Sequence, residues 1–155
     1  MTHPIAVDLK RLLAALGLIS VLLTPVFALQ DFDAQKLLIA RTQHDIIQLL
    51  LKERNFDAVF PELDKIFGLR LPAEHEDKVV REVRIIADAF YQNQRADLSI
   101  RVLERGTLGV AHPKSKAELC QEMGYVYRLQ GNDMKAMECF RKAQQFAQKL
   151  TARPF

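Results

Sequence analysis

Apolar side chains in this chain recur at intervals of three and four positions, and this spacing most limits how the chain can fold. One set is Val79, Val83, Ile86 and Phe90, and a later set is Ala136, Phe140, Ala143, Ala147 and Leu150. Such intervals are typical of an α-helix that buries one broad stripe. No segment sustains the alternation of apolar and polar residues that a half-buried strand requires. The sequence therefore predicts an all-α protein.

Turn and capping residues mark where these helices begin and end. Gly131 suits a left-handed turn, and Asn132 or Asp133 suits the cap of the helix that follows. Ser115 and Glu118 have the spacing of a capping box, in which each side chain reaches the backbone amide of the other residue. A helix is therefore expected to begin just after Ser115 and another just after Asn132.

Joints of alternating length separate six predicted helices. These helices span residues 31–53, 57–67, 73–93, 96–105, 116–130 and 133–151. Pro61 lies inside the second, which should therefore start late or bend at that residue. Short joints favour antiparallel neighbours, so the six helices are predicted to form three hairpins.

The last hairpin contains the most regular pattern of small and aromatic residues. The residues of this pattern are Met123, Gly124, Tyr127, Gly131, Ala136, Phe140 and Ala143. Gly124 and Ala136 are small where two antiparallel helices would approach closely. Residues 117–150 resemble the tetratricopeptide repeat, which has leucine-glycine, tyrosine, glycine, alanine, phenylalanine and alanine at these relative positions. Cys120 departs from that pattern, which has tryptophan there, and Gln148 departs where it often has proline.

Upstream segments match the same pattern more loosely. Ala87 lies 37 residues before Gly124, and Ile47 lies another 40 residues back, whereas a strict repeat has about 34. The extra residues are expected in the loops between hairpins. The resemblance implies three stacked antiparallel helix hairpins in a right-handed α-α superhelix, with the first helix of each pair lining a concave, protein-binding face.

The resemblance also implies which side chains line that concave face. In the last hairpin they are Glu118, Gln121, Tyr125 and Arg128, and in the second they are Arg81, Arg84, Asp88 and Tyr91. Tyrosine offers rigid aromatic area and arginine offers directional hydrogen-bond donors, and peptide recognition uses both. The alternative is that these side chains only solvate a helix surface, as charged helix faces commonly do.

The first 28 residues have the order of a secretory signal peptide. Lys10 and Arg11 precede an apolar run at residues 12–23. Val26 and Ala28 fit the compact residues that a signal peptidase requires before its cut. Cleavage is therefore expected after Ala28.

Cleavage at that point would leave residues 29–155 as a helical-repeat domain in the periplasm or outside the cell. An uncleaved leader would instead anchor the protein in the membrane through residues 12–29, a stretch barely long enough to cross a bilayer. A third alternative is that the apolar run is a core helix of a cytosolic protein.

Motifs of known catalytic chemistry are not found in the sequence, whether phosphate-binding loops, nucleophile elbows, zinc-binding helices or haem sites. His75 has Glu74, Glu76 and Asp77 beside it, which would suffice for a metal-binding corner, but acids at a helix start are better explained by the helix dipole. The net charge of +3 is too small for a typical nucleic-acid binder. The sequence therefore predicts no enzyme, no cofactor, no metal and no nucleic-acid partner.

Cys120 and Cys139 lie on the two helices of the last predicted hairpin. A protein outside the cytoplasm can form a disulfide. However, Phe140 is expected to face the partner helix, which turns Cys139 aside by about 100°. Two buried free thiols are therefore favoured over a disulfide, and a reactive role is the third alternative.

Taken together, these patterns predict an exported, non-enzymatic scaffold or adaptor that binds a protein or peptide segment and assembles or stabilises an envelope complex. Repeat arrays usually end in a polar capping helix. The last predicted helix instead carries Phe146 and Leu150, so the C-terminal hairpin is expected to be an association surface, including for a second copy. The alternatives are a small extracytoplasmic helical enzyme or ligand-binding domain, or a signal-anchored subunit of a membrane complex.

Overall fold

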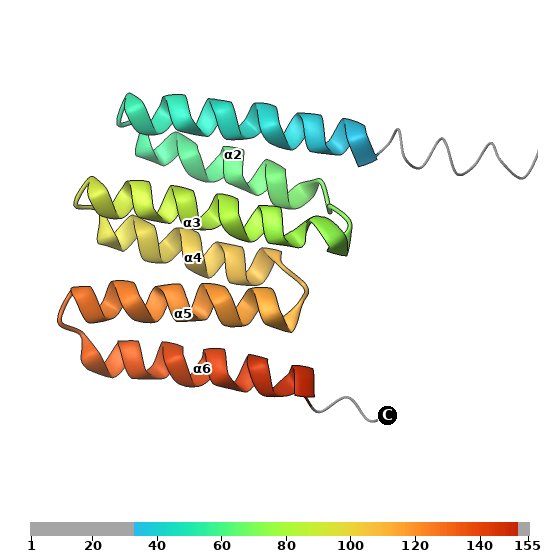
Figure 1. Ribbon diagram of the computed structural model, residues 1–155. Helices are drawn as coiled ribbons and strands as arrows, with labels where there is room; N and C mark the ends of the chain where they lie inside the picture. The colour runs from blue at the N-terminus through green and yellow to red at the C-terminus, as the bar shows by residue number, and fades with distance from the viewer. Residues whose placement is uncertain (1–32, 152–155) are drawn as a thin grey trace, which may run out of the picture. The chain divides into compact units, whose positions relative to one another are not determined.

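The computed structural model describes residues 33–151, and every regular element within that range is a helix (Figure 1). The predicted all-α class is confirmed for these residues. The chain divides into two compact units, Met1–Lys36 and Leu37–Phe155, and the second contains the helix hairpins. The predicted leader, residues 1–28, lies outside the described residues.

The helix bounds agree with the predicted ones to within a few residues. A first helix occupies residues 33–52 and is called helix 33–52. It is followed by α2 (Phe56–Gly68), the short 3-10 helix η1 (Ala73–His75), α3 (Glu76–Gln92), α4 (Ala96–Gly109), α5 (Pro113–Leu129) and α6 (Asp133–Thr151). Helix α2 begins at Phe56 and continues through Pro61, so the expected late start is wrong.

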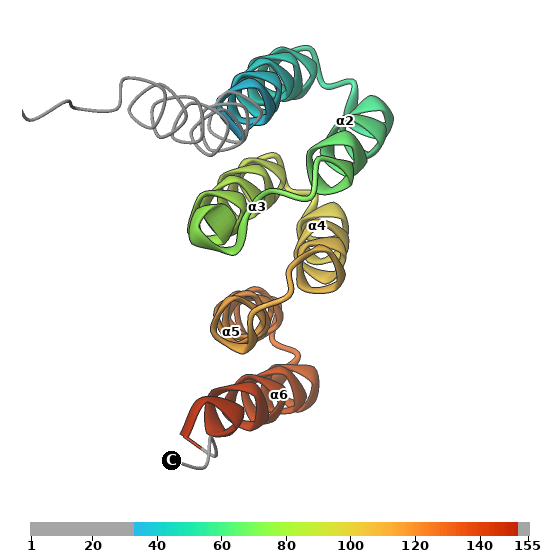
Figure 2. The same ribbon diagram turned by 90° about the vertical axis from the view of Figure 1, so that its right-hand side faces the viewer.

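The helices of the second unit pack side by side in two layers. Helix α3 contacts α4 and α5, α4 contacts α5, and α5 contacts α6. Figure 2 shows residues 37–52, α3 and α5 in one row and α2, α4 and α6 in the other. We call these rows the first-helix layer and the second-helix layer, because each contains one helix of every hairpin.

The three turns inside the hairpins have the same backbone structure. Arg54, Gln94 and Gly131 each adopt a left-handed conformation, with φ of 58°, 61° and 75°. In each turn the following amide donates to the carbonyl five residues before it, over 2.9 Å, which is the Schellman arrangement at a helix end. The left-handed residues lie 40 and 37 residues apart. The hairpins therefore share the register that the spacing of Ile47, Ala87 and Gly124 predicts.

The two joints between hairpins differ in length. Residues 69–75 connect α2 to α3, whereas residues 110–112 connect α4 to α5, and the longer first joint accounts for the longer interval. Glu76, the first residue of α3, forms hydrogen bonds with the second joint and with the first turn of α5. Its carboxylate accepts hydrogen bonds from the backbone amides of Ala111 and His112 and, over 2.9 Å, from the hydroxyl of Ser115. The start of α3 is thereby tied to the start of α5.

The predicted capping box at Ser115 is wrong, whereas the predicted cap at Asn132 is confirmed. Helix α5 already begins at Pro113, because the fixed φ of proline suits the first turn and its missing N–H is not needed there. Ser115 is therefore inside the helix and buried, and its hydroxyl donates to Glu76. At α6, the Asn132 side-chain oxygen accepts from the amide of Lys135 over 3.2 Å.

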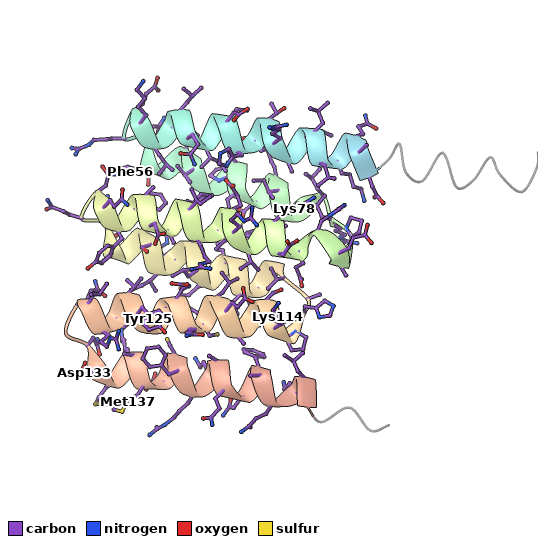
Figure 3. The ribbon with its side chains drawn as sticks, in the orientation of Figure 1. Phe56, Lys78, Lys114, Tyr125, Asp133 and Met137 are labelled. Atoms are coloured by element: carbon purple, nitrogen blue, oxygen red, sulfur yellow. The ribbon has the colours of Figure 1, made fainter. Side chains whose placement is uncertain are left out.

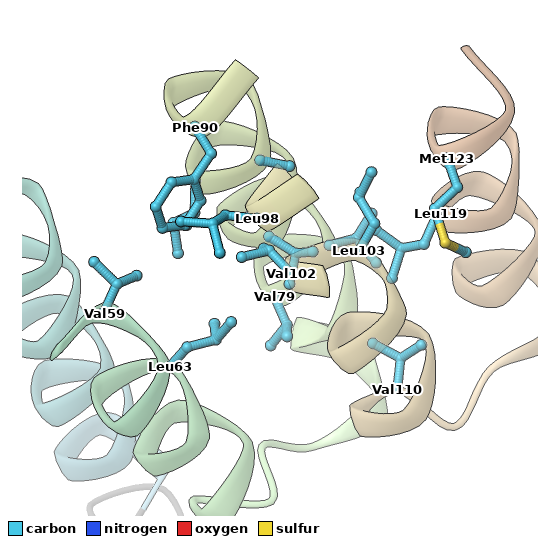
Figure 4. Close-up of a cluster of buried hydrophobic side chains, with 14 of the residues drawn as sticks. Val59, Leu63, Val79, Phe90, Leu98, Val102, Leu103, Val110, Leu119 and Met123 are labelled. Atoms are coloured by element: carbon cyan, nitrogen blue, oxygen red, sulfur yellow. The ribbon is translucent and has the colours of Figure 1, made fainter. Parts of the chain in front are cut away.

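A continuous row of aliphatic and aromatic side chains fills the space between the helices (Figure 4). The largest fully buried members include Ile47, Leu63, Val83, Ile86, Phe90, Leu103 and Leu119. Glycines mark the closest contacts: a Cβ at Gly106 would lie 2.6 Å from Val83 Cγ1, and a Cβ at Gly124 would lie 2.5 Å from Phe140 Cε1. The predicted close approach at Gly124 is confirmed, and Ala136 is buried as expected.

The predicted apolar stripe of α6 does not extend to the end of the helix. Ala147 is exposed, and Leu150 keeps 44% of its surface exposed. The neighbouring Phe146 packs against the core in place of Ala147. Leu150 lies in the last turn of a 19-residue helix whose partner α5 has only 17 residues, so that turn extends past the end of the hairpin.

Candidate binding surface of the first-helix layer

Charged side chains bridge neighbouring helices of the first-helix layer. The imidazole Nδ1 of His44 lies 2.5 and 2.6 Å from the two carboxylate oxygens of Glu82 on α3. The guanidinium of Arg84 lies 2.6 Å from the carboxylate of Glu122 on α5. His44 and Arg84 each lie ten residues before the left-handed residue of their hairpin turn. Equivalent positions therefore connect each first helix to the next one along the stack.

Gln121 occupies the equivalent position of the third hairpin and makes a different contact. Its side-chain amide donates to the hydroxyl of Tyr125 over 2.7 Å. The Tyr125 ring packs edge-on against Phe140 of α6 with a centroid separation of 5.4 Å, and the guanidinium carbon of Arg128 lies 5.2 Å from the Tyr125 centroid (Figure 3). Two of the other predicted residues of α5, Gln121 and Arg128, thus contact Tyr125.

The other predicted residues do not join that group. The Glu118 carboxylate approaches the lysine one turn earlier, at 3.9 Å. Arg84 and Asp88 line a small depression where α3, α4 and α5 meet. Arg81 is exposed near the start of α3, and Tyr91 is partly buried near its end. The predicted surface is therefore two polar patches along one layer rather than one cluster.

A cavity of about 270 Å³ lies where helix 33–52, the end of α2 and the start of α3 meet. Its apolar lining residues are Leu37, Ala40, Ile66, Leu71 and Val79, and its charged or titratable ones are Arg41, His44, Lys78, Arg81 and Glu82. Arg81 is the one member of this lining that the sequence predicted as a binding residue. His44 lies 40 residues before Arg84, which is the interval between the first two hairpins. Transferring the position of Arg84 to the first hairpin would therefore have identified His44 from the sequence.

The described residues contain no group of three or more histidine, cysteine or acidic side chains placed to hold a metal ion. The ring of His75 approaches Glu74 at 3.8 Å and Lys78 at 3.3 Å, while Glu76 holds the second joint. Glu76 is therefore used within the fold rather than left free for a metal ion. Within residues 33–151, no helix is long and apolar enough to cross a membrane.

Cys120 and Cys139 are buried free thiols, as the sequence favoured. Burial raises the pKa of the Cys120 thiol and of the Cys139 thiol above the ordinary value. The thiolate is the nucleophilic form of cysteine. A raised thiol pKa therefore opposes a reactive role for either residue.

Neither a family model nor a curated protein matches the chain.

Proposed function

We propose that this chain is a non-enzymatic scaffold or adaptor that binds a protein or peptide segment through stacked, tetratricopeptide-like helix hairpins. The observation that carries the proposal is the recurrence of one hairpin turn at residues 54, 94 and 131. Hairpins in the same register present equivalent side chains at regular intervals along one layer. Stacked helical repeats use such extended surfaces to bind proteins, and a right-handed superhelix would make that surface concave.

The chemistry of the first-helix layer suits protein recognition. Tyr125, Arg128 and Gln121 form one mixed aromatic and polar patch, and Arg84 with Asp88 forms another. Aromatic and arginine side chains contribute most to binding energy at protein interfaces. Both patches lie on helices, so little backbone freedom is lost when a partner binds.

The third hairpin also favours association through its outer side. Leu129, Met134 and Met137 leave 65%, 72% and 49% of their surfaces exposed, and Figure 3 shows Met137 on the side of α6 away from α5. Large apolar side chains that gather at one exposed end mark a candidate interface. We include self-association through the C-terminal hairpin in the proposal.

The order of residues 1–28 supports export to the periplasm or the cell exterior, where the scaffold would assemble or stabilise an envelope complex. Retention of residues 12–29 as an anchor would instead make it a subunit of a membrane complex. Neither form needs a cofactor, because binding is the whole activity.

The proposal is tested by affinity purification of the full chain, tagged at its C-terminus, from its native cell. A specific protein should co-purify, and the double variant Gln121→Ala with Arg128→Ala should lose it. Arg141→Ala, an exposed arginine on α6, is the matched control and should retain the partner. A partner that both variants retain, or turnover of a small molecule by the purified chain, would count against a scaffold that binds through this layer.

A further inference from the structure

The cavity between helix 33–52 and α3 has an apolar interior. Leu37 and Ala40 line it from the first helix, Ile66 from the end of α2, and Val79 from the first turns of α3. All of its lining residues belong to the second unit of the chain. Its volume of about 270 Å³ lies just below the range of about 300–1,000 Å³ that is typical of sites for drug-sized ligands. A space of this size can hold one or two apolar side chains.

The rim of the same cavity is cationic. Arg41 and Arg81 are exposed and form no ion pair with the residues that the structure describes. Lys78 adds a third positive charge, and among the described residues its ammonium nitrogen lies 3.3 Å from the His75 ring and forms no ion pair with an acid. Glu82 is the acidic member of the lining, and both of its oxygens are engaged by His44. The rim therefore has positive charge that the fold itself leaves unbalanced.

We propose that this cavity is an anchor pocket for an acidic peptide segment of a partner protein. One large apolar side chain of the segment enters between Ala40 and Val79, and flanking carboxylates meet Arg41, Lys78 and Arg81. The inference rests on the proposed scaffold function and names the chemical class of its partner. Apolar anchors that fill a pocket supply affinity, and a complementary rim of charge supplies specificity and a faster encounter.

Titration of the full chain with a short fluorescein-labelled peptide tests the pocket. The probe has one leucine–phenylalanine pair flanked on both sides by aspartate and glutamate. Two control peptides replace the apolar pair by serine, or the acids by lysine. We expect binding of the probe only, with an affinity that falls as salt rises, because exposed charges are screened.

Two variants of the chain separate the interior of the cavity from its rim. The double variant Arg41→Glu with Arg81→Glu should weaken binding about tenfold or more, because two exposed attractions become repulsions. Ala40→Phe should abolish binding by filling the cavity without changing its charge. Arg141→Glu is the matched charge control on α6 and should bind as the unchanged chain does. Far-ultraviolet circular dichroism establishes that each variant is folded.

Three results overturn the inference. They are equal binding of the acidic and lysine-flanked peptides, binding that Ala40→Phe leaves unchanged, and binding of decanoate at this cavity without binding of the peptide. The scaffold proposal fails separately. If the full chain captures a partner that both pocket variants retain, the pocket is wrong and the scaffold stands. If no form of the chain captures a partner, the scaffold fails, and the titration still decides whether the pocket takes acidic peptides.

Discussion

Replacing Gly124 by alanine should have two opposing effects on the free energy of unfolding. In the interior of a helix, alanine is more favourable than glycine by about 1 kcal/mol. The new Cβ, however, would lie 2.5 Å from Cε1 and 2.7 Å from Cδ1 of Phe140. Carbon atoms are in best contact at about 3.5–4.0 Å, so the phenylalanine ring would have to move by about 1 Å.

Movement of that ring is restricted because Phe140 also packs edge-on against Tyr125, at 5.4 Å between centroids. Overpacking of this kind costs about 1–3 kcal/mol. Subtracting the gain in helix propensity leaves a net loss of about 1 kcal/mol in the free energy of unfolding. For a unit of this size that loss lowers Tm by about 3–5 °C.

Gly68 provides the matched control, since it is the last residue of α2 and a Cβ there would meet nothing within 4 Å. Gly68→Ala should therefore stabilise the chain, by up to about 1 kcal/mol. Urea denaturation followed by circular dichroism measures both variants, together with the double variant Gly124→Ala with Phe140→Leu, in which a smaller side chain should recover part of the loss. Equal stabilisation by Gly124→Ala and Gly68→Ala would refute the close approach of α5 and α6.

The remaining predictions concern the turns, the thiols and the leader. Gly131→Ala should cost about 1 kcal/mol in urea denaturation because φ is positive there, whereas Gln94→Gly should stabilise the equivalent turn by about 0.5 kcal/mol. The pKa values of the Cys120 and Cys139 thiols are raised in the folded state, so the unfolded chain loses these protons at a lower pH. The free energy of unfolding should therefore fall as pH rises past about 9, and it should fall less in the double variant Cys120→Ser with Cys139→Ser. N-terminal sequencing of exported material should begin at Leu29, and an intact N-terminus would refute cleavage.

The periodic features of the fold were predictable from the sequence, because they repeat. Ile47, Ala87 and Gly124 each lie seven residues before a left-handed turn residue, so their spacing agrees with the register of the three hairpins that the helix ranges predicted. Helix type also followed from local spacing, since each helix buries one stripe.

Features that depend on a single long-range contact were not predictable in this way. Ser115 has the local spacing of a cap, but its hydroxyl is taken by Glu76, which lies 39 residues earlier in the chain. Phe146 rather than Ala147 packs against the core, because only the geometry of the helix pair decides which of two neighbours faces inward.

The candidate binding residues show the same difference between features that follow a repeating local pattern and features that depend on long-range contacts. The sequence pattern selected Gln121, Tyr125 and Arg128, which do gather in the structure. The cavity was not predicted, because its lining comes from three separate helices and from the joint that follows α2. No local pattern joins Ala40 to Val79.

The side-by-side packing of consecutive helices has a consequence for how the chain folds and opens. Because α3 contacts α4 and α5, and α6 contacts α5, native contacts join segments that are near one another in sequence. Such a topology favours fast folding. It also allows the ends to open before the middle, as in linear repeat arrays. Backbone amides of α4 should therefore exchange with deuterium more slowly than those of α6, and a partner bound across several hairpins would reduce that difference.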